Sequence, residues 1–234
     1  MNMQRWSRYG LAVLAAISLF APLHALQAQA QRAGVERTQQ RDATRWENAI
    51  AKIEAASNRE PGGIVFTGSS SIARWTTLAQ DFPGLPVRNH GFGGSIVSEV
   101  THFVDRIVVP YKPRMVLFYA GDNDLGAGRT PEQVAVDFQA FFAAVRKSLP
   151  QTKIAFISIK PSILRANLFD QMKASNALVK AWLAKQQNAV YIDVFTPMLD
   201  EKGAVRTDLF VADNLHMNPT GYAIWTRVVG PYLK

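Results

Sequence analysis

Five candidate strands constrain the fold of this chain more than any other feature. Segments with helical periodicity lie between them. Strands that alternate with helices favour a parallel sheet, because a parallel pair needs a long crossover connection. The third and fourth runs are apolar almost throughout, as expected when helices cover both faces of a sheet. The five runs are GIVFT (63–67), PVRNH (86–90), RMVLFYA (114–120), KIAFISI (153–159) and AVYIDV (189–194).

The clearest helix is predicted over 131–148. Thr130 and Gln133 form a capping box around Pro131, which suits the first helical position. Further helices are predicted over about 167–186 and 219–229, and a first amphipathic helix ends near Ser57. These elements predict an α/β fold, a three-layer α/β/α sandwich around a five-stranded parallel sheet.

The first thirty residues have the pattern of a secretory signal peptide. Arg5 and Arg8 form a basic region, an apolar stretch runs over 11–26, and Ala28-Gln29-Ala30 is a cleavage signature. We predict cleavage after Ala30 and a periplasmic or secreted protein, with an uncleaved anchor as the alternative. Residues 31–41 are expected to be a flexible leader, and residues 42–234 a single domain.

Charge and cysteine content exclude several classes of protein. Removing residues 1–30 takes away Arg5 and Arg8 and no acidic residue, so a formal net charge of +8 becomes about +6. The basic residues are scattered and form no stripe with aromatic residues, which argues against nucleic-acid binding. At most, peripheral contact with anionic surfaces is expected. The chain has no cysteine, so it has no disulfide and no lipid-modified cysteine.

Polar clusters follow the first three strands. Ser69, Ser70 and Ser71 come after the first strand, GFGGS (91–95) after the second and GDND (121–124) after the third. Ligand and active sites of open parallel sheets form at the carboxyl ends of the strands. The loop DNLH (213–216) precedes the last helix and can fold onto this edge. Lys160 follows the fourth strand and is expected to border it.

A serine becomes a nucleophile only beside a base that a carboxylate orients. Of the four histidines, His24 lies in the predicted signal peptide, His90 ends the second strand and His102 lies at the start of a predicted helix. His216 has a carboxylate at close range, Asp213, three residues earlier. An aspartate three residues before a histidine also occurs by chance in surface loops. The motif by itself therefore does not separate a catalytic histidine from an incidental one. Likewise, the glycines of GFGGS and the asparagine of GDND fit either donors to an oxyanion or ordinary turns.

Taken together and in order, four segments resemble the blocks of the SGNH/GDSL hydrolase family, the GDSL-like lipases and acylhydrolases. They are FTGSSSI, NHGFGGS, YAGDNDL and DNLHMNPTGY, and the resemblance extends from about 63 to 230. It implies the flavodoxin-like SGNH hydrolase fold. The family's first block reads Gly-Asp-Ser, whereas this chain has Ser69 in place of the aspartate.

The resemblance also implies a role for each matching residue. Ser70 is the nucleophile, His216 the base and Asp213 the carboxylate that orients it. The Ser70 N–H, the Gly94 N–H and the Asn123 side chain form the oxyanion hole. The implied reaction is a two-step acyl transfer through an acyl-enzyme, without a metal ion or cofactor.

The expected substrate is a short-chain or acetyl ester of a carbohydrate or small molecule, because no long apolar insertion covers the blocks. Three alternatives stay open: a lysophospholipase or thioesterase, an O-acyltransferase that uses the same triad, and a non-enzymatic carbohydrate-binding protein. The sequence does not separate hydrolase from transferase, and it does not predict an oligomeric state.

Overall fold

The computed structural model of the chain describes residues 44–234. The predicted signal peptide and flexible leader lie outside the described residues, as do the first two residues of the predicted domain. Residues 45–234 form one compact unit. Among residues 44–234, no helix combines the length and the hydropathy that a membrane span requires.

The centre of this unit is a five-stranded sheet in which every pair of neighbouring strands is parallel. The strand order is β2-β1-β3-β4-β5. Each strand lies within a few residues of its predicted position. The strands are β1 (Ile64–Gly68), β2 (Val87–Gly91), β3 (Met115–Tyr119), β4 (Lys153–Ile157) and β5 (Ala189–Ile192).

Long helices connect and cover the strands. They are α2 (Glu47–Ala56), α8 (Pro131–Ser148), α9 (Phe169–Leu183) and α10 (Pro219–Val229). The predicted bounds of α8 and its capping box are confirmed: Thr130 Oγ1 accepts from the Gln133 N–H, and Gln133 Oε1 accepts from the Thr130 N–H.

Short helices fill the connections after β1, β2 and β3. They are α3 (Ser70–Ala73), α4 (Leu78–Asp81), α5 (Val97–His102), α6 (Val104–Ile107) and α7 (Asp122–Gly126). The prediction that His102 begins a helix is wrong, because it is the last residue of α5. The 3₁₀ helices are η1 (Thr44–Trp46), η2 (Val109–Tyr111), η3 (Ala166–Leu168), η4 (Thr196–Met198), η5 (Thr207–Leu209) and η6 (Gly230–Tyr232).

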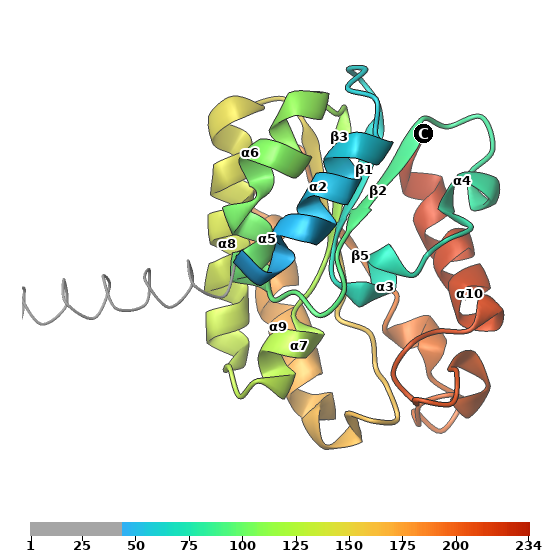
Figure 1. Cartoon of the computed structure of the whole chain (residues 1–234). Coiled ribbons are helices and arrows are strands. Elements are labelled where there is room, and N and C mark those ends of the chain that lie inside the picture. Colours follow the sequence, from blue (N-terminus) through green and yellow to red (C-terminus); the bar gives the residue numbers. More distant parts are fainter. Residues whose placement is uncertain (1–43) are drawn as a thin grey trace, which may run out of the picture. The chain divides into compact units, whose positions relative to one another are not determined.

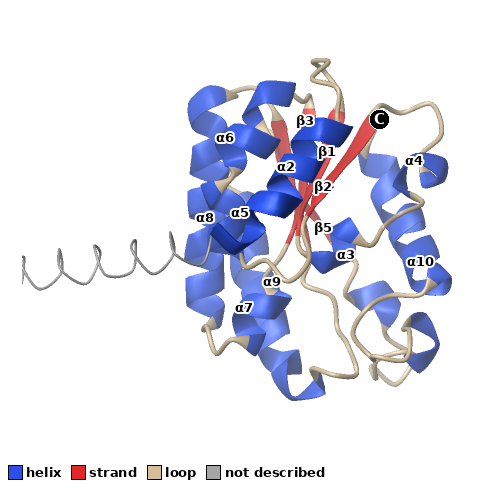
Figure 2. Ribbon diagram, viewed as in Figure 1, coloured by secondary structure: helices blue, strands red, loops and turns tan. Residues whose placement is uncertain are grey.

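Helices cover both faces of the sheet. On one face, Phe138 and Phe141 of α8 pack against Phe118 of β3, with ring centroids 5.4 and 4.3 Å apart. On the other, Trp225 of α10 packs against Tyr119 of β3, with centroids 5.0 Å apart. Phe118 and Tyr119 are neighbours in one strand, so their side chains point to opposite faces. Figures 1 and 2 show α8 and α10 on opposite sides of the strands, which confirms the predicted three-layer sandwich.

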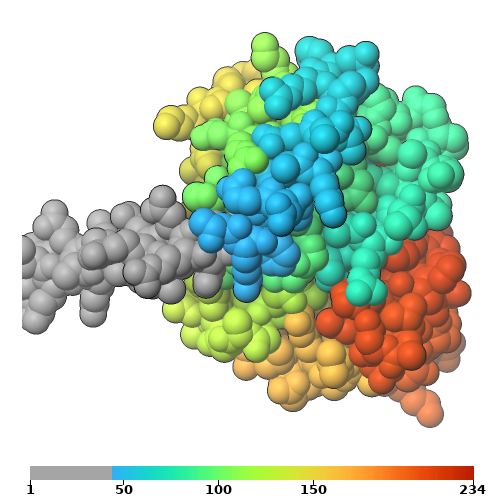
Figure 3. All heavy atoms as spheres, in the orientation of Figure 1, coloured from blue at the N-terminus to red at the C-terminus, as the bar shows by residue number. Residues whose placement is uncertain are grey.

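The last part of the chain lies beside the segments that follow β1. The Tyr222 hydroxyl of α10 donates to the Ser71 carbonyl at 3.0 Å. In Figure 3, C-terminal residues in red border residues in teal, which belong to the part of the chain near β2. The loop before α10 therefore reaches the carboxyl edge of the sheet, where the polar clusters after β1, β2 and β3 also lie.

Candidate active site

A sharp turn between β1 and α3 places Ser70 at the first position of the helix. Gly68 makes this turn possible: its φ is +132°, and a Cβ at this position would overlap the Tyr119 carbonyl oxygen. The Ser69 N–H donates to that same oxygen at 2.9 Å. The Ser69 hydroxyl, at the position of the family's aspartate, is buried and has no hydrogen-bond partner among the described residues. Backbone contacts therefore hold the turn without a carboxylate.

Strand β2 anchors the helix that begins at Ser70. Asn89 Nδ2 donates to the carbonyls of Ile72 and Trp75, at 2.6 and 3.2 Å. The Trp75 side chain is only 1% exposed, so α3 is fixed from its apolar side as well. These contacts hold Ser70 at the edge of the sheet on rigid structure, which is what a reacting side chain needs.

The loop before α10 brings His216 to Ser70. The His216 Nε2 atom lies 2.9 Å from Ser70 Oγ, and Nδ1 lies 2.6 Å from Asp213 Oδ2. The second carboxylate oxygen of Asp213 accepts from the N–H groups of Leu215 and His216, at 2.9 and 2.8 Å. Asn214, which follows Asp213, has a left-handed backbone with a φ of +58°, and this lets the loop curl back on itself.

The Asp213 carboxylate fixes the tautomer of His216. Burial by itself would raise the pKa of Asp213, but hydrogen bonds from the His216 ring and from two backbone N–H groups outweigh it and hold this pKa well below its usual value. An ionised carboxylate at Nδ1 requires the ring proton to be there. The Nε2 atom is then left with a lone pair that faces the Ser70 hydroxyl.

Gly94 lies in the loop between β2 and α5, with a left-handed φ of +82°. A Cβ added to the preceding residue, Gly93, would lie 3.8 Å from Ser70 Cβ, so this loop runs beside Ser70. Among residues 44–234, neither the Ser70 N–H nor the Gly94 N–H donates to a protein acceptor. The Trp46 ring lies against the other side of the loop, 3.5 Å from where a Gly94 Cβ would stand. Trp46 was not among the predicted site residues.

Asn123 is the second residue of α7 and is partly buried. Its Nδ2 donates to the Ser95 carbonyl at 3.0 Å, so the amide nitrogen faces the loop of Gly94. Asp124 fixes the same loop, because its carboxylate accepts from the Val97 N–H at 3.1 Å. Burial raises the pKa of Asp124 to about 7, although this hydrogen bond opposes the shift.

Two further cations lie at this edge. Lys160, which the sequence placed at the border, is 1% exposed, and its Nζ donates to the Leu215 carbonyl at 2.7 Å. Burial lowers its pKa to about 8, although Asp122 and Asp213 oppose this shift. Arg165 was not predicted. Its Nη2 donates to Asn123 Oδ1 at 2.8 Å, and no local sequence pattern predicts this contact.

The other described histidines lie apart from Ser70. His90 is fully buried, with Ser57 Oγ 2.8 Å from Nε2 and the Ile107 carbonyl 2.6 Å from Nδ1. Burial lowers its pKa to about 4, so it is neutral at physiological pH. His102 stacks edge-on against Phe103. His216 is therefore the one histidine of residues 44–234 that can act as a base for Ser70.

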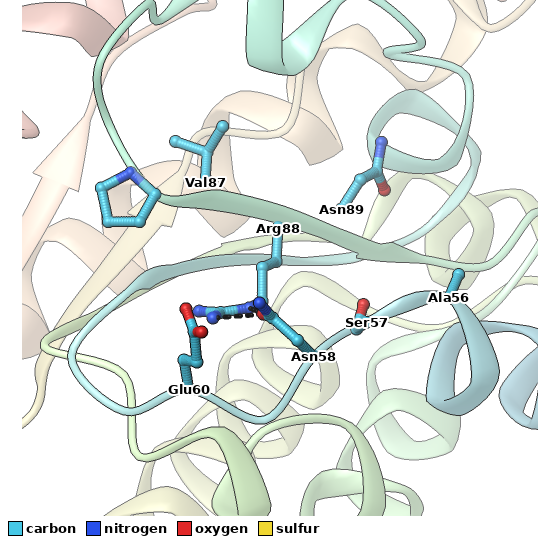
Figure 4. Close-up of a pocket in the computed structure, with 8 residues that line it drawn as sticks. Ala56, Ser57, Asn58, Glu60, Val87, Arg88 and Asn89 are labelled. Atoms are coloured by element: carbon cyan, nitrogen blue, oxygen red, sulfur yellow. Dashed lines mark hydrogen bonds between the residues drawn. The ribbon is translucent and has the colours of Figure 1, made fainter.

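A pocket of about 590 Å³ lies elsewhere, between the α2–β1 connection and the start of β2. Figure 4 shows the Arg88 side chain beside Asn58 in this pocket, and Arg88 Nη2 donates to Asn58 Oδ1 at 2.8 Å. None of the predicted site residues lines it. Within the described part of the chain, no group of three or more His, Asp or Glu side chains could hold a metal ion.

Comparison with known proteins identifies the family of this chain. The model of the GDSL-like lipase/acylhydrolase family matches residues 61–224, which include all five predicted site residues. The chain belongs to this family. The resemblance inferred from the sequence is thereby confirmed, and this family member is a hydrolase that acts on esters.

Relatives of this acylhydrolase are distant in sequence. The chicken (Gallus gallus) platelet-activating factor acetylhydrolase IB subunit alpha2 is 25% identical over 177 residues, which cover 73% of this chain and 75% of that protein. A GDSL-like lipase from Bacteroides thetaiotaomicron superposes with a TM-score of 0.68 at 18% identity, covering 82% of this chain and 96% of the other. A carbohydrate esterase of family 3 from Talaromyces cellulolyticus gives 0.60 at 19% identity, covering 74% and 96%. At these identities, the structural likeness concerns the fold.

Proposed function

We propose that the chain is a serine esterase in which Ser70, His216 and Asp213 form the catalytic triad. The observation that carries this proposal is the position of His216, with one ring nitrogen 2.9 Å from Ser70 Oγ and the other 2.6 Å from Asp213. In the first step His216 takes the Ser70 proton while Oγ attacks the ester carbonyl. His216 then protonates the departing alcohol, which leaves an acyl-enzyme on Ser70.

Water completes the cycle in a second step. His216 removes a proton from the water, whose oxygen attacks the acyl carbonyl, and Ser70 leaves with a proton returned by His216. The carbonyl oxygen carries negative charge in both tetrahedral intermediates. The N–H groups of Ser70 and Gly94 and the Asn123 amide donate to this oxyanion, and no metal ion or cofactor takes part.

We propose acetyl and other short-chain esters of carbohydrates or small molecules as substrates. The chicken relative is named an acetylhydrolase and one structural neighbour a carbohydrate esterase, which supports this choice. The N-terminal pattern further suggests that the enzyme acts in the periplasm or outside the cell.

A lysophospholipid is the second candidate substrate. Leu164 and Val211 are 59% and 39% exposed, and both adjoin the loop of the triad: the Leu164 N–H donates to the Asn214 carbonyl and the Val211 N–H to that of His216. Exposed apolar side chains at this position favour an ester with an alkyl chain.

A panel of esters tests the proposed substrates. The purified protein is expected to hydrolyse p-nitrophenyl acetate and an acetylated polysaccharide, with kcat/KM at least about tenfold lower for p-nitrophenyl octanoate than for the acetate. Equal or faster turnover of the octanoate, together with release of fatty acid from a lysophospholipid, would favour the second candidate. Lack of turnover of every ester would refute the proposed function.

Replacing Asn123 by alanine tests the oxyanion hole. Loss of one preorganised donor typically raises the barrier by about 2.7–4 kcal/mol, so kcat on p-nitrophenyl acetate is expected to fall about 10²–10³-fold. Asn58→Ala is the matched control, because the Asn58 amide is also held by an arginine, Arg88, but lies in the remote pocket. If the two variants have the same kcat, Asn123 does not stabilise the oxyanion.

A further inference from the structure

The segment that leaves β4, from Lys160 to Arg165, lies between two parts of the proposed catalytic centre. On one side it contacts the loop of Asp213 and His216 twice. The Lys160 ammonium donates to the Leu215 carbonyl at 2.7 Å, and the Leu164 N–H donates to the Asn214 carbonyl at 3.0 Å. This one segment therefore holds the carbonyls of Asn214 and Leu215, the two residues between Asp213 and His216.

On its other side the segment contacts the proposed oxyanion donor. Arg165 Nη2 donates to Asn123 Oδ1 at 2.8 Å, and Nη1 lies 3.1 Å from Asp122 Oδ2. A guanidinium has only hydrogen-bond donors. It therefore fixes one orientation of the Asn123 amide, with Oδ1 toward Arg165. The Nδ2 group must then face away from Arg165, toward the Ser95 carbonyl and the loop of Gly94.

The residues around Arg165 and Lys160 provide space for the first and nearby charges for the second. A Cβ at Gly126 would lie 3.2 Å from Arg165 Nε and 3.3 Å from Cζ, so glycine leaves room for the guanidinium. Lys160 is 1% exposed, and burial of an ammonium is unfavourable unless nearby groups compensate for the lost water. The charges around it are Asp122, Asp213 and Arg165, all from the same edge. A neutral side chain would fill this space without that penalty.

We infer that Lys160 and Arg165 are positioning residues for ester hydrolysis, Lys160 for the His216 loop and Arg165 for the Asn123 amide. This inference rests on the proposed function, because it assigns the two cations to its base and its oxyanion hole. His216 and Asn123 lie far apart in sequence, His216 in the loop before α10 and Asn123 in α7. One short segment thus sets the position of both relative to Ser70.

A double-mutant cycle tests the role of Arg165. Arg165→Met is expected to lower kcat for p-nitrophenyl acetate about tenfold with little change in KM. In the Asn123→Ala background the same substitution is expected to have almost no effect, because Arg165 acts through that amide. An arginine that only supports the fold would cost the same factor in both backgrounds, and this result would overturn the inference. If Arg165→Met does not fold, Arg165→Gln replaces it in the cycle.

Lys160 is tested by two substitutions that differ in hydrogen bonding. Lys160→Met is expected to lower kcat about tenfold at unchanged KM, and Lys160→Gln, which keeps a donor, to recover part of the loss. Equal kcat values in the wild type and Lys160→Met would overturn the role of Lys160.

Arg146→Met is the matched control for both cations. Arg146 also donates to backbone carbonyls, those of Thr152 and Asn188 among them, but at the opposite edge of the sheet, where β4 and β5 begin. Its loss is expected to lower the melting temperature and leave kcat unchanged. If Arg146→Met lowered kcat as much as Arg165→Met, the loss of an arginine remote from Ser70 would have the same effect. This result would overturn the inference. Turnover that does not depend on Ser70 would instead refute the proposed function.

Discussion

Replacing Ser70 by alanine is expected to lower kcat for p-nitrophenyl acetate by a factor on the order of 10⁶ and to abolish labelling by a fluorophosphonate. The reason is chemical: in the proposed mechanism no acyl-enzyme forms without Oγ, and His216 loses the group whose proton it would take. The substitution removes one hydrogen bond, to His216, from a residue that is 8% exposed. The melting temperature is therefore expected to stay within a few degrees of the wild type, so lost activity would report lost chemistry.

The two neighbouring serines are the controls for this prediction. Ser69 and Ser71 are both buried, and the Ser69 hydroxyl has no hydrogen-bond partner among the described residues. Ser69→Ala and Ser71→Ala are therefore expected to keep kcat within a few-fold of the wild type and to be labelled. Labelling retained in Ser70→Ala but lost in Ser69→Ala would move the nucleophile to Ser69.

The sheet could be predicted from the sequence because its strands are short, apolar and bounded by turn residues. Burial on both faces leaves a continuous apolar run, as in Met115–Tyr119, where all five residues are buried. In a parallel sheet, the carboxyl ends of all strands lie at the same edge. This predicts that the clusters after β1, β2 and β3 lie close together. The structure agrees: Ser70, Asn123 and the loop of Gly94 lie at one edge.

Other features depend on tertiary contacts and have no local pattern. The helices α3 to α7 are too short for a recognisable apolar period, which is why His102 was placed at the wrong end of one. Arg165 reaches Asn123 across 42 positions, and Trp46 reaches the loop of Gly94 from the region before α2. A lysine after a strand could be placed at the site's border, but its burial and its contact with Leu215 could not be predicted.

Replacing Asp213 by asparagine is expected to lower kcat about 10⁴-fold, or about 5 kcal/mol of barrier, with little change in KM. The loop keeps its shape, because the asparagine oxygen still accepts from the N–H groups of Leu215 and His216. The amide nitrogen, however, replaces the carboxylate oxygen at His216 Nδ1. As a donor it favours the tautomer with the proton on Nε2, which then cannot take the Ser70 proton.

The pH dependence of the same variant separates this explanation from a structural one. The pKa of Asp213 lies well below its usual value, so the carboxylate is ionised above about pH 4 and its titration sets neither limb of the wild-type profile between pH 5 and 9. The deficit of Asp213→Asn in kcat is therefore expected at every pH in that range. Asp193→Asn is the matched control: Asp193 Oδ1 also accepts two backbone N–H groups, those of Phe195 and Thr196, after β5. It is expected to keep wild-type kcat, and an equal loss in both variants would mean that Asp213 acts only by shaping its loop.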